Sequence, residues 1–554
     1  MTENRRGEIR EAEGDNQGRM TALNYPLGGP QETLSYDAMS NLSAISETVC
    51  TDWGSSGCNS WTTGQFASAT YLNTGQLSSL FEYSGIGSAT YSYSYNSLQQ
   101  MTGMSYTPNA IGGATSQALT YTYGAGQNNG RITQFSDTGT AGTGEVVNYT
   151  YDSLNRLIAA STSNGSGPQW GESYAYDGFG NLLSKTPTKG TAPQVSTGVN
   201  AATNQMAPSD ANGNWLGTNT PQNTWDVENR LISSGLYDGG GNLISYSYDP
   251  WGKRIMQYAN GGDAGLSTCQ IYFYGVNGKR LGTYTCGYNA GQFTAGTRSI
   301  NQYFGKRLIT SGAETGPGAV FTDRLGSVRQ GGNGQMAYFP YGEERTSTPD
   351  GTDKFGTYFR DGYGQDYAEQ RYYTSNYGRF WSVDPKGYRA ADSKNPTSWN
   401  QYAYVKGDPA NLMDRQGADD DDPCGDDPEV VPSRPPNPVS ACVSDPGPEP
   451  PGPPQAPQNC IQTLDPSFTS NYTVYIMTMR IINENSFWSL GSKSYENGDK
   501  AGHPTGPTIT WASLALEDQA IASVIMNLAN TPYSGYGSVA AAAYQNGGGR
   551  RGTA

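Results

Sequence analysis

The sequence predicts a mainly β protein built from many short antiparallel hairpins, and three observations support this fold class. Glycine and proline account for 73 and 32 of the 554 residues, a share of turn formers too high for long helices to dominate. Tyrosine is the commonest aromatic residue, with 40 copies against 14 phenylalanines and 10 tryptophans. The third observation is a short phrase, Tyr-x-Tyr-Asp followed by turn residues, that recurs through the first half of the chain.

Charge and composition exclude several classes of function. The formal net charge of −15 argues against nucleic acid or an anionic membrane as the main partner. One histidine rules out a histidine metal cage, and the seven cysteines lack metal-type spacing, so neither a metal nor a cofactor is expected. The polar N-terminus and the absence of a run of eighteen apolar residues predict neither a signal peptide nor a membrane span. The product is therefore expected in the cytoplasm until an export machine, or a segment upstream of Met1, carries it out.

The recurring phrase is best described as a hairpin. In the copy at 174–183, strand alternation places Tyr174 and Tyr176 on one face, and Asp177 can accept a backbone N–H bond across the turn. Gly180 tolerates positive φ, and Leu182 begins the return strand. The clear copies are SYDAMSNL at 35–42, YTYDSLNRLI at 149–158, YAYDGFGNLL at 174–183, TWDVENRLI at 224–232, LYDGGGNLI at 236–244 and YSYDPWGKRI at 246–255.

These phrases resemble the YD repeats of the Rhs (rearrangement hot spot) and teneurin-type proteins. The resemblance implies hairpins wound as one spiralling antiparallel sheet into a hollow shell, here over residues 21–319, after a disordered N-terminus at 1–20. The tyrosines then serve to stabilise the wall of the shell.

One hairpin within this region carries a pair of cysteines. The segment CQIYFYGVNGKRLGTYTC at 269–286 is centred on Asn277-Gly278, a strong two-residue turn signal. Cys269 and Cys286 lie equally far from the turn and therefore face each other across the hairpin. Either a cross-strand disulfide or two reduced thiols fits this placement.

Residues 320–417 resemble the Rhs repeat-associated core in the order and spacing of five blocks. The blocks are FTDRLGSVRQ at 321–330, AYFPYGEERT at 337–346, KFGTYFRD at 354–361, QRYYTSNYGRFWSVDP at 370–385 and NQYAYVKGDPANLMDRQG at 400–417. The resemblance implies that this core closes the end of the shell.

The same resemblance implies an aspartyl autoprotease that cuts after the closing motif. The matching residues are Asp384 and Asp414 as the carboxylate pair, with Arg379 as an orienting or charge-balancing group. Cleavage would follow Ala418 and leave Asp419 as the new N-terminus. Arg415 stands where the family has proline, and its charge favours an ionised Asp414, the wrong form for an acid partner. The alternative is that these residues only plug and stabilise the shell.

Residues 418–460 change character and predict a linker. Proline is dense here, and the run Asp419–Asp422 cannot fold back around a calcium ion, so an extended, acidic, solvated hinge is expected.

Residues 461–554 form a variable tail, expected to be small and α+β or partly disordered. Its clearest element is a helix over 511–530, which resembles the helical part of spore-cortex-lytic cell-wall hydrolases. The glutamate that precedes this helix in those enzymes is missing at the expected distance. The other candidate acids and the one candidate base, each equally compatible with a solvated surface position, are Glu496, Glu517, Asp518 and His503.

Together the resemblances imply an Rhs-type polymorphic toxin or effector shell that holds its own C-terminal tail as cargo. Such a protein is expected to be secreted or cell-surface associated, with an export machine and an immunity protein as partners. Two alternatives stay open: a surface adhesion or glycan-binding protein whose tyrosine rows stack on sugars, and an inactive truncated fragment.

Overall fold

The computed structural model describes residues 12–418, and the predicted tail with most of the predicted linker lies outside this range. Within the range, short segments are also outside the description: 27–28, 55–56, 85–86, 110–115, 125, 127, 164–166, 239, 261–265, 276–277, 290–291, 362–364 and 388–395. The described residues are strands, turns and a few 3-10 turns, which confirms the mainly β fold class.

The strands form antiparallel sheets in which each strand pairs with its neighbours in sequence. The first sheet contains β1 (Ala12–Gly14), β2 (Met20–Asn24), β3 (Gln31–Tyr36), β4 (Leu42–Gly54), β5 (Gly57–Tyr71), β6 (Leu77–Ser84), β7 (Gly87–Tyr95), β8 (Met101–Pro108), β9 (Gln117–Tyr123), β10 (Ile132–Thr138), β11 (Glu145–Tyr151), β12 (Leu157–Thr162), β13 (Trp170–Tyr176), β14 (Leu182–Gly190) and β15 (Val195–Ser196).

A short hairpin, β16 (Val199–Asn200) with β17 (Gln205–Met206), leads to a second long sheet. That sheet contains β18 (Thr224–Trp225), β19 (Leu231–Tyr237), β20 (Leu243–Tyr248), β21 (Arg254–Asn260), β22 (Leu266–Tyr274), β23 (Arg280–Asn289), β24 (Gln292–Phe304), β25 (Arg307–Ala313) and β26 (Gly318–Ala319). We refer to β1–β26 as the shell.

Two small sheets follow. They contain β27 (Phe321–Thr322), β28 (Val328–Gly331) and β29 (Gly334–Gln335), then β30 (Thr352–Asp353), β31 (Phe359–Asp361), β32 (Gln365–Ala368), β33 (Arg371–Thr374) and β34 (Arg379–Phe380). The 3-10 turns are η3 (Phe355–Thr357), η6 (Pro396–Trp399) and η7 (Val405–Gly407). We refer to residues 320–418 as the core segment. Among the described residues, no helix has the length and apolar character needed to cross a membrane.

The turn of the Tyr-Asp phrase has one repeated geometry. Oδ1 of Asp177 accepts hydrogen bonds from the backbone N–H groups of Phe179 and Asn181, both at 2.9 Å. The next-to-last turn residue, Gly180, has φ of +81°, which explains why this place is filled by glycine or asparagine in most copies. The same pair of bonds to a carboxylate occurs at Asp15, Asp37, Asp152, Asp210, Asp226, Asp238, Asp249 and Asp323.

A tyrosine that precedes many of the hairpin turns ties its hairpin to the preceding one. The hydroxyl of Tyr176 donates to the carbonyl oxygen of Leu157 at 2.7 Å, and Leu157 is the first residue of β12. Other repeat tyrosines donate in the same way to the first residue of the neighbouring return strand: Tyr36, Tyr71, Tyr95, Tyr123, Tyr151, Tyr248, Tyr274 and Tyr303. A phrase with such a tyrosine therefore both closes its own turn and fixes its position on the neighbouring hairpin.

The cysteine hairpin has the expected register but a different turn. The ladder pairs Gln270 with Thr285, which places Cys269 opposite Cys286; their Cα atoms are 4.9 Å apart and a disulfide joins them. The ladder does not continue to the Asn-Gly pair, because it shifts register at Tyr274, which pairs with Arg280. The backbone N–H of Gly275 then donates to the carbonyl of Lys279, as in the Tyr-Asp turns, so this hairpin is another copy of the repeat.

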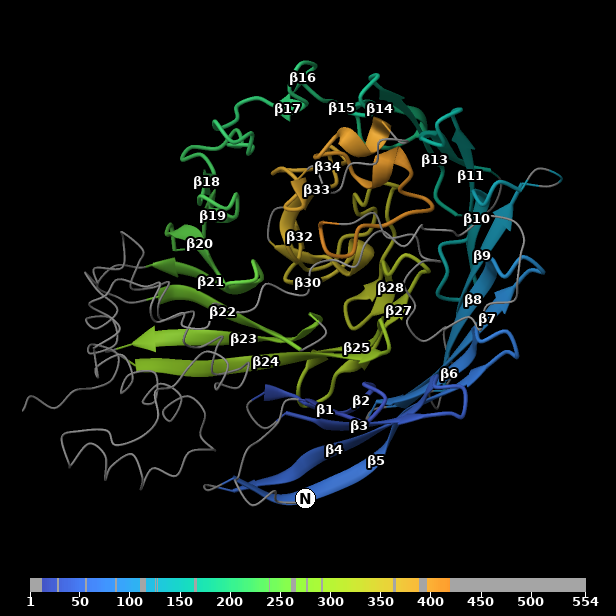
Figure 1. Cartoon of the computed structure of the whole chain (residues 1–554), viewed down its shortest axis with the longest axis vertical. Helices are drawn as coiled ribbons and strands as arrows, with labels where there is room; N and C mark the ends of the chain where they lie inside the picture. Colours follow the sequence, from blue (N-terminus) through green and yellow to red (C-terminus); the bar gives the residue numbers. More distant parts are fainter. Residues whose placement is uncertain are drawn as a thin grey trace, which may run out of the picture.

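The shell curves into a ring, and the core segment lies inside it, as Figure 1 shows. The inward aromatic side chains of the shell pack against aromatic side chains of the core segment. Tyr106 stacks on Phe321 with 5.5 Å between ring centroids, and Trp170 meets Phe339 edge-on at 5.0 Å. Further pairs of this kind are Tyr174 with Tyr341, Trp215 with Trp381, Tyr246 with Tyr372 and Tyr272 with Phe359. The space within this ring is therefore filled by the core segment.

Buried ion pairs also join the shell to the core segment. The Arg254 side chain is fully buried, and its Nη2 lies 3.1 Å from Oδ1 of Asp361. Further pairs across the same interface are Arg131 with Asp408, Lys185 with Glu343, Arg280 with Asp353 and Glu145 with Arg345. Because an unpaired buried charge is costly, these pairs favour one orientation of the core segment within the ring.

Candidate functional site

Two carboxylates that lie 30 residues apart in the sequence meet at one arginine. Asp384 follows β34, and Asp414 lies near the end of the described chain; both side chains are buried. Nη2 of Arg371, the first residue of β33, is 3.0 Å from Oδ2 of Asp384 and 3.1 Å from Oδ2 of Asp414. The two carboxylate oxygens are therefore no more than about 6 Å apart.

Arg371 is held firmly in this place. Its guanidinium carbon lies 3.7 Å from the centroid of the Phe380 ring, and its Nη1 donates to the carbonyl of Gln401 at 2.8 Å. The side chain is only 4% exposed, so the cation attracts the two carboxylates with little screening by water.

The chain leaves the core segment at the same point. Nε of Arg371 donates to the carbonyl oxygen of Gly417, and Oδ1 of Asp414 accepts a hydrogen bond from the backbone N–H of Ala418 at 3.0 Å. The hydroxyl of Tyr358 donates to the carbonyl of Asp414 itself. The peptide group between Gly417 and Ala418 is thus bound at both its oxygen and its nitrogen by groups of the carboxylate cluster.

Only glycine fits at position 417. Its φ is +67°, a region that other residues rarely adopt, and a Cβ there would lie 2.4 Å from the carbonyl oxygen of Ala368. The glycine of the closing motif therefore lets the chain pass close to the β32–β33 turn.

Asp384 is oriented by the backbone of the residues that follow it. Its Oδ1 accepts the backbone N–H of Lys386 at 2.8 Å, and its carbonyl accepts the N–H of Gly387 at 2.9 Å. This tight turn after the Ser-Val-Asp-Pro sequence leaves Oδ2 directed at Arg371.

Arg379, which the sequence indicated as the orienting cation, lies elsewhere. Its Nη2 donates to the carbonyl of Asn204, its guanidinium lies 5.1 Å from the centroid of Tyr402, and burial lowers its pKa to about 10. The β33–β34 pairing explains why Arg371 and not Arg379 reaches the carboxylates. Tyr373 pairs with Phe380, and Arg371, two residues before Tyr373, lies on the same face of the sheet as Phe380. Arg379 is on the opposite face. The choice between the two arginines follows from this strand register, for which the sequence carries no separate signal.

Arg415 makes a contact away from the carboxylates. Its Nη1 lies beside Gly326, in the turn that follows Asp323. Arg371 contacts Oδ2 of Asp414 and reaches it from β33.

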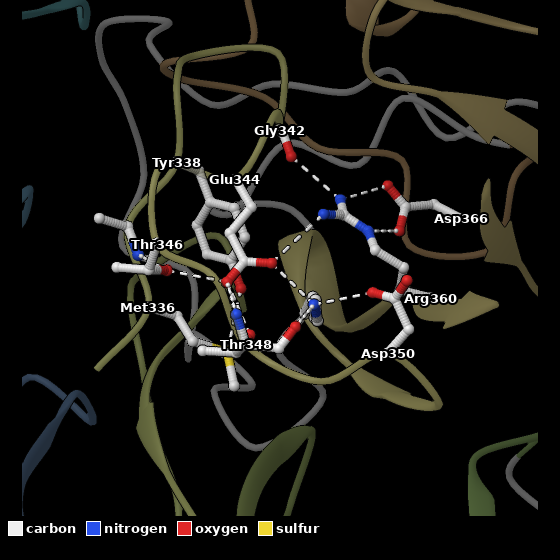
Figure 2. Close-up of polar contacts among 11 residues, drawn as sticks. Met336, Tyr338, Gly342, Glu344, Thr346, Thr348, Asp350, Arg360 and Asp366 are labelled. Atoms are coloured by element: carbon white, nitrogen blue, oxygen red, sulfur yellow. Dashed lines mark hydrogen bonds and ion pairs between the residues drawn. The ribbon is translucent and has the colours of Figure 1, made fainter. Parts of the chain in front are cut away.

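A second network of charges lies within and beside the sheet that contains Arg371, and Figure 2 shows it. Nε of Arg360 on β31 is 2.8 Å from Oδ1 of Asp366 on β32, which ties β31 to the strand that pairs with β33. Nζ of Lys354 lies 2.7 Å from Glu344 and 2.9 Å from Asp350. Lys354 and Asp366 are fully buried, so this network fixes the core hairpins as a rigid support.

The remaining residues considered from the sequence lie outside the described part of the chain. These are Asp419 at the predicted cleavage point and the tail residues Glu496, His503, Glu517 and Asp518.

Comparison with known proteins identifies the fold. No protein-family model and no curated protein matches the sequence. Among solved structures, the chain resembles TcdB2-TccC3 with a TM-score of 0.59 and 20% identity over 73% of this chain and 22% of that one. It resembles TcdB2-TccC3 without its hypervariable C-terminal region equally, with a TM-score of 0.59 and 20% identity over 73% and 21% of the two chains.

The Photorhabdus luminescens Tc holotoxin pore, with a substitution in TccC3, gives a TM-score of 0.58 and 19% identity over 74% and 21% of the two chains. The TM-scores establish a shared fold, and identities this low establish no shared chemistry. The chain therefore has the Rhs-like YD-shell fold of TcdB2-TccC3 and spans about a fifth of that chain's length.

Proposed function

We propose that this chain is a toxin-shell protein of the Rhs type whose core segment cuts its own chain after Ala418. The cut releases residues 419–554 as a cargo that acts outside the producing cell. The shell and the inserted core segment form the scaffold, and the cluster of Asp384, Asp414 and Arg371 is the cleavage site.

The observation that carries the proposal is the meeting of Asp384 and Asp414 at the point where the chain leaves the core segment. Two nearby carboxyl groups that share one proton can hydrolyse a peptide, with one acting as base and the other as acid. Arg371 holds the two carboxyl groups close to each other, since its Nη2 contacts Oδ2 of both.

The proposed step consumes one water molecule. The ionised carboxylate takes a proton from water, and the water oxygen attacks the carbonyl carbon of Ala418. The protonated carboxyl gives its proton to the nitrogen of Asp419 as the C–N bond breaks. The products are a new carboxyl terminus at Ala418 and a new amino terminus at Asp419, and the pair again holds one proton.

The test is the state of the freshly purified full chain on a denaturing gel. The wild-type chain is expected as two pieces, residues 1–418 and 419–554, and Asp384→Asn as one intact band, because an amide cannot accept or donate the required proton. Asp226→Asn is the control, because Asp226 is also paired with an arginine, Arg230, but lies in the shell outside the cluster. An uncut wild-type chain, or equal cutting of Asp384→Asn, would refute the proposal.

Two other functions can be weighed against the same structure. An adhesion protein that stacks sugars on tyrosine rows needs those rings to be accessible, yet Tyr91, Tyr106, Tyr121, Tyr174 and Tyr246 are all buried. An inactive fragment would keep the fold and show no cleavage. Export, an immunity partner and a cell-wall target for the cargo belong to the proposal as requirements of a toxin and need their own experiments.

A further inference from the structure

We propose that Arg371 is a positioning residue that sets which peptide bond the carboxylate pair cuts. This inference rests on the proposed autoproteolysis, since it concerns the register of the chain within the same site. Arg371 holds the peptide group that precedes Ala418, and the carbonyl of Ala418 is then the next one along the chain to reach the carboxylates.

The first support is the way in which one guanidinium binds both the chain and the carboxylates. Nε of Arg371 binds the carbonyl oxygen of Gly417, and Nη2 binds Asp384 and Asp414. Nε–H and one Nη2 hydrogen lie along one edge of the planar fork, so the chain and both carboxylates are aligned by a single rigid group. A lysine ammonium is a point charge and cannot impose this alignment.

The second support is that the peptide is bound on its other side as well. Oδ1 of Asp414 accepts the N–H of Ala418 at 3.0 Å. A shift of the chain by one residue moves every peptide group by about 3.8 Å, which would break this bond and the bond to Arg371 together. The two bonds therefore define one register.

The third support is the glycine at 417. A Cβ there would meet the Ala368 carbonyl at 2.4 Å, and the flanking residues Gln416 and Ala418 both carry a Cβ. A chain shifted by one residue in either direction would place one of these side chains against that carbonyl. The β32–β33 turn thus accepts the chain in the register that Arg371 binds.

The main experiment compares full-length wild type with Arg371→Lys, using the gel for rate and N-terminal sequencing of the small fragment for position. Wild type is expected to give a single start at Asp419. Arg371→Lys is expected to cut at least tenfold more slowly and to give mixed starts at Ala418, Asp419 and Asp420. Arg345→Lys, a variant of a largely buried arginine that is paired with Glu145 outside the cluster, is expected to keep the single start.

A second measurement does not depend on cleavage. In the uncut Asp384→Asn chain, hydrogen exchange of the Ala418 amide is expected to be slow, and adding Arg371→Lys is expected to accelerate it at least tenfold. If wild type is never cut, the proposed function fails, while this measurement still decides whether Arg371 holds the chain. Cleavage of Arg371→Lys at one unchanged bond, at any rate, or unchanged exchange of the Ala418 amide would overturn the inference.

Discussion

Glu32 is an acidic side chain buried where the first strands of the shell meet the last ones. It lies on β3 and is 3% exposed, and Nε2 of Gln302 on β24 lies 3.3 Å from Glu32 and 2.6 Å from Glu47. Burial, followed by the charge of Glu47, raises the pKa of Glu32 to about 8, against the smaller opposing effects of Gln302, Tyr25 and Lys279. Glu32 is therefore protonated at neutral pH, and one amide joins two acids across the seam of the ring.

This raised pKa predicts a stability that falls as the pH rises. The folded chain keeps the Glu32 proton up to a pH of about 8, whereas the unfolded chain releases it near 4.5. Between those values the free energy of unfolding should decrease by about 1.4 kcal/mol per pH unit from this group. Urea unfolding across that range should show a slope in Glu32→Gln, which keeps the shape of the protonated acid, that is smaller than the wild-type slope by about this amount, since Glu172 and Asp408 also have raised pKa values. The exposed Glu228→Gln serves as the control and should keep the wild-type slope; an equal slope in Glu32→Gln would contradict the assignment.

At the same scale, the sequence could indicate the two aspartates of the proposed cleavage site but not their arginine. Asp384 and Asp414 stand in motifs with recognisable order and spacing. Arg371 and Arg379 are both in one such motif, and only the pairing of β33 with β34 decides which of them faces the carboxylates. That choice depends on a strand register, which residue identity alone does not fix.

At the scale of one hairpin, local chemistry determines most of the structure. The Tyr-Asp phrase predicted the turn, because a carboxylate that accepts backbone N–H groups and a residue tolerant of positive φ are both visible in the sequence. The acceptor of each tyrosine hydroxyl could not be predicted. It belongs to the neighbouring hairpin, at a variable distance along the chain, from 16 residues for Tyr36 to 29 for Tyr71.

The tyrosine bonds between hairpins predict a measurable loss of stability. Tyr123 donates to the carbonyl of Met101 at 2.9 Å, and Tyr123→Phe removes this bond while it keeps the ring. The free energy of unfolding should fall by about 1 kcal/mol, since a partly buried carbonyl loses its donor. Tyr83→Phe, at a ring that is 52% exposed, should change it by less than about 0.5 kcal/mol. Equal effects of the two substitutions in urea unfolding would show that the bond contributes nothing.

At the scale of the whole molecule, the stability of the ring depends on the segment inside it. The shell face that meets the core segment carries tyrosines and charged residues as well as aliphatic side chains such as Leu157 and Leu308. Arg254 illustrates the arrangement, because its guanidinium lies within 4.4 Å of the Tyr272 ring centroid and 4.3 Å of that of Tyr367. Asp361 of the core segment supplies its counter-charge. Neither part of this site is complete without the other.

Removing that counter-charge should therefore be far more harmful than removing one at the surface. Asp361→Asn leaves Arg254 buried without an anion, and breaking such a pair costs about 3–5 kcal/mol. Glu314→Gln removes the partner of Arg298 in a pair that is about a quarter exposed, and should cost less than about 1 kcal/mol. Urea unfolding of the two variants measures the difference. Similar costs would mean that the core segment does not depend on its ion pairs with the shell.

The central claim, that the two carboxylates inside the ring cut the chain where it leaves the core segment, is tested most directly by intact mass. The wild-type chain, dissolved in denaturant immediately after purification, should give two masses that correspond to residues 1–418 and 419–554. The Asp384→Asn chain should give one mass, that of all 554 residues. A single full-length mass for the wild type, or two fragments from Asp384→Asn, would contradict the account.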